Sequence, residues 1–132
     1  MNAEELKQRT KLFALRTIKL VNALPKNITG RSIGNQLIRC GTSVAANYRA
    51  ACRAKSRADF IAKMGIVEEE ADESLFWMEI IIESKLIKKE LISDLMKEAN
   101  ELLAITVSSK ISARKNLGNN RQSTIGDRKF KA

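Results

Sequence analysis

The sequence has no histidine, one proline, six glycines and few aromatic residues, which make up 5% of its 132 residues. Without histidine, the chain lacks the Ser-His-Asp and Cys-His arrangements of nucleophilic catalysis, the Glu-x-x-His di-iron motif of helical bundles and nearly all zinc sites. The shortage of proline and glycine leaves few residues that interrupt a helix. We therefore expect long helices, no enzymatic activity, no cofactor and no bound metal.

The two cysteines, Cys40 and Cys52, lie on one predicted helix. At 1.5 Å per residue their separation along that helix is about 18 Å, too far for a disulfide. The chain shows no signal peptide and no apolar run of about 18 residues, and it starts with a charged segment. These features predict a cytoplasmic protein with reduced thiols.

The net charge of +9 is unevenly distributed along the chain. Residues 1–57 hold 12 basic and 2 acidic side chains, residues 58–113 hold 6 and 12, and residues 114–132 hold 6 and 1. A basic half and a basic end indicate a polyanionic partner, although such a charge also serves solubility and complementary self-association.

Apolar residues at three- and four-residue steps predict four helices, over residues 3–24, 31–54, 57–84 and 88–113. Pro25 ends the first helix. Ser56 is expected to cap the third helix by accepting a backbone N–H, with Asp59 at the positive helix end. The core face of this third helix is the strongest pattern in the chain: Phe60, Met64, Val67, Ala71, Leu75, Met78 and Ile82.

Four amphipathic helices with short connections predict an all-α fold, an antiparallel up-down-up-down four-helix bundle over residues 1–113. From Arg114 onward the apolar pattern stops. Because residues 114–132 have too little apolar surface to offset the entropy of ordering, we expect a flexible basic C-terminal tail.

The second helix presents three faces on a helical wheel. One is apolar, one carries arginines opposite the core, and one carries small residues that would let another helix approach closely. The arginines either contact phosphates or form a solvated helix back that pairs with acids of the third helix, in the same chain or in a neighbouring subunit. The candidate nucleic-acid-binding residues on this helix and the tail are Arg31, Arg39, Arg49, Arg53, Arg114, Lys115, Arg121, Arg128, Lys129 and Lys131.

The segment FWMEIII, residues 76–82, is apolar nearly all round. After Met78 and Ile82 face the core, the remaining apolar side chains still need cover, which is typical of a partner surface. Together with the small-residue face of the second helix, they give the candidate oligomer interface: Gly34, Gly41, Ala45, Phe76, Trp77, Ile80 and Ile81.

The run from Ser32 to Ser84 resembles the family of four-helix bundle proteins encoded within intervening sequences of bacterial 23S ribosomal RNA genes. The elements that carry the resemblance are Ser32, Ile33, Gln36, Leu37, Thr42, Ser43, Asn47, Tyr48, Ser56, Asp59, Phe60, Lys63, Met64, Glu73 and Trp77. The resemblance implies an antiparallel four-helix bundle that assembles as a homopentamer and has no established enzymatic activity. It also implies a build similar to that of the accessory variability proteins of diversity-generating retroelements, which bind nucleic acid.

The sequence departs from the family pattern at two places. The family more often has an acid after Asn-Tyr, where Arg49 and Ala50 stand, and a glycine near the turn between the third and fourth helices, where Lys85 stands. The first departure makes the second helix more basic.

Two functions are predicted from these observations. The leading one is a non-enzymatic oligomer that binds RNA or DNA without sequence specificity, through the arginines of the second helix and the basic tail. The alternative is a structural or protein-interaction scaffold with no nucleic-acid role.

Overall fold

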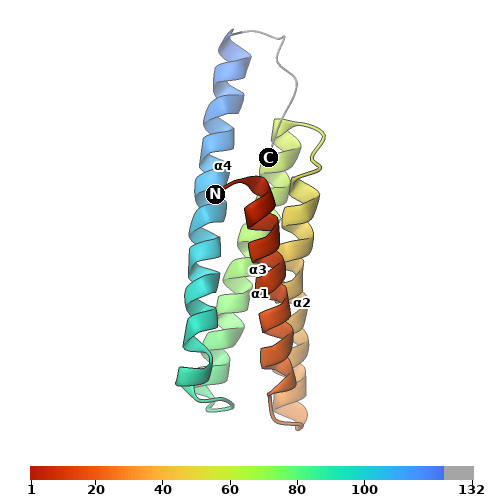
Figure 1. Ribbon diagram of the computed structural model, residues 1–132, viewed down its shortest axis with the longest axis vertical. Helices are drawn as coiled ribbons and strands as arrows, with labels where there is room; N and C mark the ends of the chain where they lie inside the picture. Colours follow the sequence, from red (N-terminus) through yellow and green to blue (C-terminus); the bar gives the residue numbers. More distant parts are fainter. Residues whose placement is uncertain (124–132) are drawn as a thin grey trace.

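The computed structural model describes residues 1–123, with side chains described through residue 118, and it consists of four long helices. Helix α1 spans Ala3–Asn22, α2 spans Ile28–Ala51, α3 spans Arg57–Glu83 and α4 spans Ser93–Ser123, and a short 3-10 helix, η1, covers Lys89–Leu91. The four helices run up and down in alternation (Figure 1). The predicted all-α four-helix bundle is confirmed.

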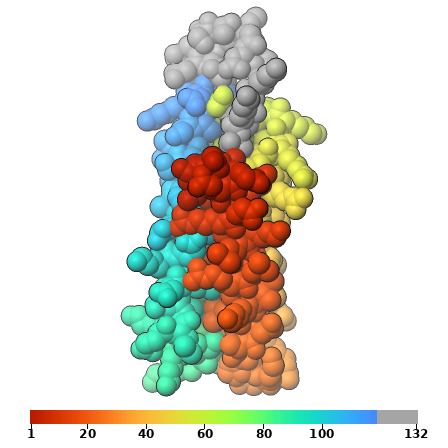
Figure 2. All heavy atoms as spheres, viewed as in Figure 1, coloured from red at the N-terminus to blue at the C-terminus, as the bar shows by residue number. Residues whose placement is uncertain are grey.

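Each helix packs mainly against its neighbour in sequence, so that α1 lies on α2, α2 on α3 and α3 on α4. The remaining seam, between α1 and α4, is thinner; both helices lie on the same face of an elongated molecule (Figure 2). Arg9 bridges this seam, since its guanidinium donates to both carboxylate oxygens of Glu98 and to Glu101, each at 2.7 Å. Helices α1 and α3 thus occupy opposite corners of the bundle.

Side-chain caps fix where three of the helices begin. Asn2 and Glu5 form a reciprocal capping box at the start of α1. The Ser56 hydroxyl accepts the backbone N–H of Asp59 at 3.0 Å, as predicted. Asn27 accepts the N–H of Gly30 at 2.8 Å, so α2 begins at Ile28, three residues before the predicted start.

The turn after α3 contains the one described non-glycine residue with positive φ, Lys85 at 60°. The N–H of Leu86 bonds the carbonyl of Ile81, and the N–H of Lys85 bonds that of Ile82, both at 3.0 Å. This Schellman arrangement normally places glycine where Lys85 stands. The 3-10 helix η1 follows this turn, and α4 begins at Ser93, five residues after the predicted residue 88.

Helix α4 continues to Ser123, ten residues past its predicted end. In this extension arginine, lysine, leucine and glutamine favour helix, whereas Gly118, at a cost of about 1 kcal/mol, and three asparagines disfavour it. Ala113, at the predicted end of the helix, is still buried, at 4% exposure. Residues 114–123, which were predicted to belong to the tail, are therefore helical, and residues 124–132 lie outside the described residues.

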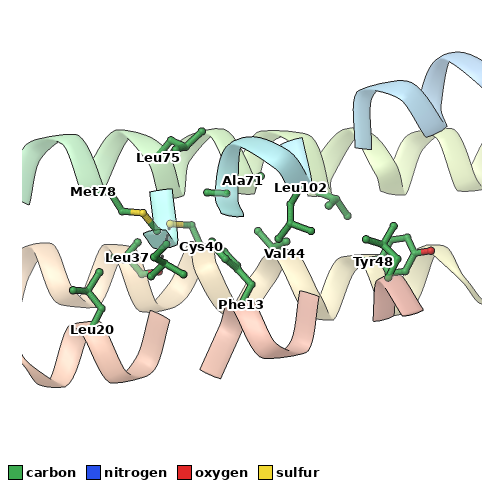
Figure 3. Packing of buried hydrophobic residues seen from close by; sticks show 14 of the residues in the cluster. Phe13, Leu20, Leu37, Cys40, Val44, Tyr48, Ala71, Leu75, Met78 and Leu102 are labelled. Carbon is green, nitrogen blue, oxygen red and sulfur yellow. Dashed lines mark hydrogen bonds between the residues drawn. The ribbon is translucent and has the colours of Figure 1, made fainter. Parts of the chain in front are cut away.

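The core runs along the bundle axis and receives side chains from all four helices (Figure 3). Most of the predicted third-helix series is buried. The prediction was wrong at its end: Ile81 is fully buried, whereas Ile82 is only half-buried. A three-residue step from Met78 keeps the stripe on the core side, and the Schellman turn closes over Ile81.

The small-residue face of α2 packs against α1 of the same chain. A Cβ on Gly34 would lie 3.0 Å from Val21, and one on Gly41 would lie 2.6 Å from Thr17. The close helix approach was predicted, but the neighbour lies within the subunit. Gly34, Gly41 and Ile81 are therefore removed from the candidate oligomer interface, because each is covered inside the bundle.

Candidate nucleic-acid interface

Arg39 forms ion pairs with two acids of α3. Its Nη1 donates to Glu70 at 3.0 Å and its Nη2 donates to Glu73 at 2.5 Å. The indole N–H of Trp77 donates to the same Glu73 carboxylate at 3.1 Å. The sequence left open whether the arginines contact phosphates or pair with acids of the third helix. Arg39 pairs with such acids, within the same chain.

The paired Glu73 carboxylate makes stability depend on pH. The hydrogen bond from Arg39 is the main cause that lowers the pKa of Glu73 below its ordinary value of 4.5, and the hydrogen bond from Trp77 lowers it further. A carboxylate with a lowered folded-state pKa stabilises the fold above its unfolded pKa, and this contribution is lost as pH falls through the folded pKa. We expect Glu73→Gln to flatten the decline of the free energy of unfolding that begins near pH 4.5 on acidification.

Urea denaturation at a series of acidic pH values measures this decline. Arg39→Gln should flatten it in the same way, because it removes the main donor to Glu73. Equal pH dependence in the wild type and both variants would contradict the assignment.

Arg31 and Arg49 of α2 are exposed, and so is Arg53, which lies just past the end of α2 at Ala51 rather than inside the predicted helix 31–54. Among the described residues, none of them has a carboxylate within ion-pair distance. Arg31 lies beside the α1–α2 turn at one end of the bundle, near Lys26. Arg49 and Arg53 lie at the opposite end, toward the start of α1.

Arg49 and Arg53 line an open groove between α1 and α2 with a volume of about 480 Å³. Lys7 and Lys11 of α1 line the other side of this groove. We call these four cations and the space between them the basic groove. Its complete lining is Glu4, Lys7, Gln8, Lys11, Thr42, Ala45, Ala46, Arg49 and Arg53.

The basic groove has more cations than acids, and the α2 residues between them are small: Thr42, Ala45 and Ala46. Its one acid, Glu4, pairs with Lys7 at 3.1 Å. No other cation of the groove has an ion-pair partner among the described residues. The Thr42 hydroxyl is satisfied by the carbonyl of Ile38 at 2.6 Å, and Ala45 beside it is half-buried. No aromatic side chain lines the groove. Such a surface offers charge to phosphates but no platform for stacked bases.

Sequence reasoning missed Lys7 and Lys11 because it considered the arginines of the second helix by themselves. The available signal was the four-residue spacing of the two lysines, which places them on one face of α1. Identifying the groove also requires knowing that this face lies beside the C-terminal half of α2.

The C-terminal candidates are only partly placed by the structure. Arg114 and Lys115 are exposed on the continuation of α4, not in a tail that starts at residue 114. Arg121 lies within α4, but its side chain is outside the described set, as are Arg128, Lys129 and Lys131 altogether.

Apart from Asp59, which pairs with Lys63 at 2.7 Å, the acids of α3 divide into two sets. Glu68 pairs with Lys110 of α4 at 2.5 Å, and Glu70 and Glu73 pair with Arg39. The second set is exposed and lies on the outer side of α3: Glu69, Asp72, Glu79 and Glu83. Within the described part of the chain, no group of three carboxylate or thiol side chains is arranged to hold a metal ion.

Of the remaining candidates for an oligomer interface, Phe76 is 50% exposed on this outer side of α3. Trp77 and Ile80 beside it are half-buried. The two rings meet edge to face, with centroids 4.9 Å apart.

The thiol of Cys40 lies in the core. It accepts a hydrogen bond from the Ser74 hydroxyl at 3.3 Å, and burial raises the pKa of Cys40 above its ordinary value. A buried thiol with a raised pKa is a poor nucleophile. Cys40 and Ser74 thus form a neutral polar contact between α2 and α3.

Within the described residues, no helix combines the length and apolarity that crossing a lipid bilayer requires.

Comparison with known proteins matches the chain to one family model and to solved structures. The family model of the 23S rRNA-intervening sequence protein matches residues 3–108. A crystal structure of a protein with unknown function from the S23 ribosomal protein family of Bacteroides thetaiotaomicron is 33% identical, with a TM-score of 0.75. That likeness covers 79% of this chain and 96% of the other. No curated protein matches the chain.

Proposed function

The chain belongs to the 23S rRNA-intervening sequence protein family, and we propose that it is a non-enzymatic protein that binds RNA or DNA phosphates in the basic groove. The observation that carries the proposal is the convergence on one open groove of Lys7 and Lys11 from α1, Arg49 from α2 and Arg53 from the turn after α2. Three of these four cations lack an ion-pair partner among the described residues. Cations left without partners in a groove are available to phosphate oxygens.

Binding of this kind reads charge and shape rather than sequence. The groove offers one amide, Gln8, and no aromatic ring. Sequence readout requires several polar groups that match base edges, and base stacking requires aromatic faces. We therefore expect affinity to depend strongly on salt and weakly on base sequence.

Of the arginines considered, only Arg39 fits the structural role that the scaffold alternative predicts. This arginine forms two ion pairs with α3 in the same subunit, so we exclude it from the proposed phosphate contacts. Arg49 and Arg53, the exposed arginines of the basic groove, remain among the proposed phosphate contacts. A homo-oligomer, which the family resemblance implies, would multiply each weak contact through avidity.

The test is charge reversal in the basic groove. The triple variant Lys11→Glu, Arg49→Glu and Arg53→Glu should bind a short duplex of mixed sequence at least about 100-fold more weakly at low salt. The slope of log affinity against log salt should fall in magnitude by about 3, since each neutralised phosphate contributes about 0.9. Fluorescence anisotropy at several salt concentrations measures both quantities, with RNA and DNA duplexes in parallel.

A matched control separates the groove from net charge. Lys88, Lys89 and Lys97 are exposed at the α3–α4 end of the bundle, away from the groove. Reversing all three to glutamate changes net charge by the same amount and should leave most of the affinity. If both triple variants bound equally well, or if the wild type bound no duplex at low salt, the proposed function would be wrong.

A further inference from the structure

A second group of cations lies at the other end of the α1–α2 pair from the basic groove. Lys26 and Arg31 are exposed beside the turn that joins the two helices, and they line a small groove with a volume of about 210 Å³. Lys26 donates to the carbonyl of Asn22 at 3.4 Å. Among the described residues, neither cation has a carboxylate within ion-pair distance. We call Lys26 and Arg31 the turn cations.

The turn cations and the basic groove lie on the same side of the molecule. Arg31 and Arg49 both belong to α2, and the 18 residues between them make five complete helical turns at about 3.6 residues per turn. Their side chains therefore leave α2 in the same direction, about 27 Å apart at about 1.5 Å per residue. In Figure 1, the α1–α2 turn lies at the lower end of the bundle and the end of α2 at the upper end.

Between Arg31 and Arg49 the same side of α2 is uncharged. It carries neutral side chains that are exposed or half-buried: Asn35, Ile38, Thr42 and Ala46. No acid occurs from residue 6 to residue 58, a range that includes most of α1 and all of α2. Neither helix therefore places a carboxylate between the two groups of cations, where it would repel phosphates.

Two groups of cations with a neutral surface between them suit the way a duplex presents its phosphates. Along one side of B-form DNA, each backbone approaches a flat surface once per helical turn of about 34–36 Å, and a groove lies between successive approaches. Long arginine and lysine side chains on a helix can reach phosphates at that spacing from positions about 27 Å apart. With a persistence length of about 50 nm, a duplex is also stiff over this distance, so it contacts both groups without the loss of chain entropy that a flexible single strand would suffer.

We propose that the basic groove and the turn cations together hold one duplex, which lies lengthwise along the α1–α2 side. The preferred ligand is then double-stranded nucleic acid of about one helical turn or more. This inference rests on the proposed function, because it assigns a ligand class to the same groove. It adds Lys26 and Arg31 as phosphate contacts and leaves Arg39, which pairs with α3, outside the binding surface.

The length of the duplex tests the assignment. Fluorescence anisotropy would compare two hairpins with the same loop and with stems of 6 and 12 base pairs, about 20 and about 41 Å long. The short stem cannot reach both groups of cations, so it should bind mainly at the four cations of the basic groove. Measurement at about 0.1 M salt, where the Debye length is about 10 Å, keeps the distant turn cations from acting on it.

The variant Lys26→Gln/Arg31→Gln should weaken binding of the long stem by at least about tenfold, and the slope of log affinity against log salt should fall in magnitude by about 2. Its affinity for the short stem should stay within about twofold of the wild type, because that stem does not reach the substituted residues. Both side chains are exposed, and circular dichroism checks that the fold is unchanged.

A matched control is Lys88→Gln/Lys89→Gln. These two lysines are exposed at the same end of the bundle, at the turn between α3 and α4, so the variant changes net charge equally without touching the α1–α2 side. It should leave the affinity for both stems within about twofold of the wild type. An unpaired strand with as many nucleotides as the long hairpin should bind the wild type at least about tenfold more weakly than that hairpin.

The outcomes separate this inference from the proposed function. If the wild type bound neither hairpin, the proposed function would fail, and the duplex assignment with it. If the groove triple variant lost affinity while Lys26→Gln/Arg31→Gln bound the long stem as tightly as the wild type, groove binding would stand and the assignment of a one-turn duplex would be wrong. Equal affinity for the unpaired strand and the long hairpin would also overturn it.

Discussion

Replacing Phe13 by alanine is expected to lower the free energy of unfolding by about 3–5 kcal/mol. Phe13 is fully buried, and it points from α1 toward Leu37 and Cys40 of α2 (Figure 3). Removing its ring loses buried apolar contact and leaves a cavity that the long, regular helices around it cannot easily close. Urea denaturation followed by circular dichroism measures the change.

Ile111→Ala is the control for this substitution. Ile111 lies in α4 and is 46% exposed, so its truncation should change stability by no more than about 0.5 kcal/mol. Because alanine is the best helix former, neither loss can come from helix propensity. Equal losses in the two variants would contradict the core role of Phe13.

Gly41→Val is expected to cost about 3 kcal/mol, at the upper end of what overpacking usually costs. The first added carbon would lie 2.6 Å from Cγ2 and 2.9 Å from Oγ1 of Thr17. Thr17 is fully buried, and its hydroxyl donates to the Phe13 carbonyl at 2.8 Å. Because Thr17 has no free space to rotate into, relief requires α1 and α2 to move apart.

Gly65→Val provides the same change of residue without the clash. A carbon added at Gly65 of α3 meets no atom within 4 Å. This variant should therefore stay within about 0.5 kcal/mol of the wild type, because valine is the better helix former. Thermal or urea unfolding of both variants should separate them clearly. A similar stability for the two would contradict the tight α1–α2 contact.

Hydrophobic spacing was enough to predict the number of helices and most of their buried faces, and the residue types of Ser56 and Asp59 predicted the cap of α3. Where the prediction failed, the cause was a local feature that the spacing of apolar residues does not reveal. Ile81, rather than Ile82, enters the core because the chain reverses immediately after it, with Lys85 in a left-handed conformation. The extension of α4 was missed because residues 114–123 lack an apolar stripe and mix good with poor helix formers, so neither signal indicated a helix there.

The candidate site was harder to predict than the fold, because it depends on which helix lies beside which. The arginine row on α2 was recognised, yet the structure divides it. Arg39 faces the acids of α3, whereas Arg49 and Arg53 face the lysines of α1. The small-residue face was likewise identified, but only the packing shows that its neighbour is α1 of the same chain.

The sequential packing of the helices also bears on how fast the chain folds. Since most contacts join helices that follow each other, each helical hairpin closes only a short loop and loses little chain entropy. Folds dominated by such local contacts form in microseconds to milliseconds. The hairpin of α1 and α2 can form before α4 has been synthesised, and the α1–α4 seam with Arg9 is then the last to close.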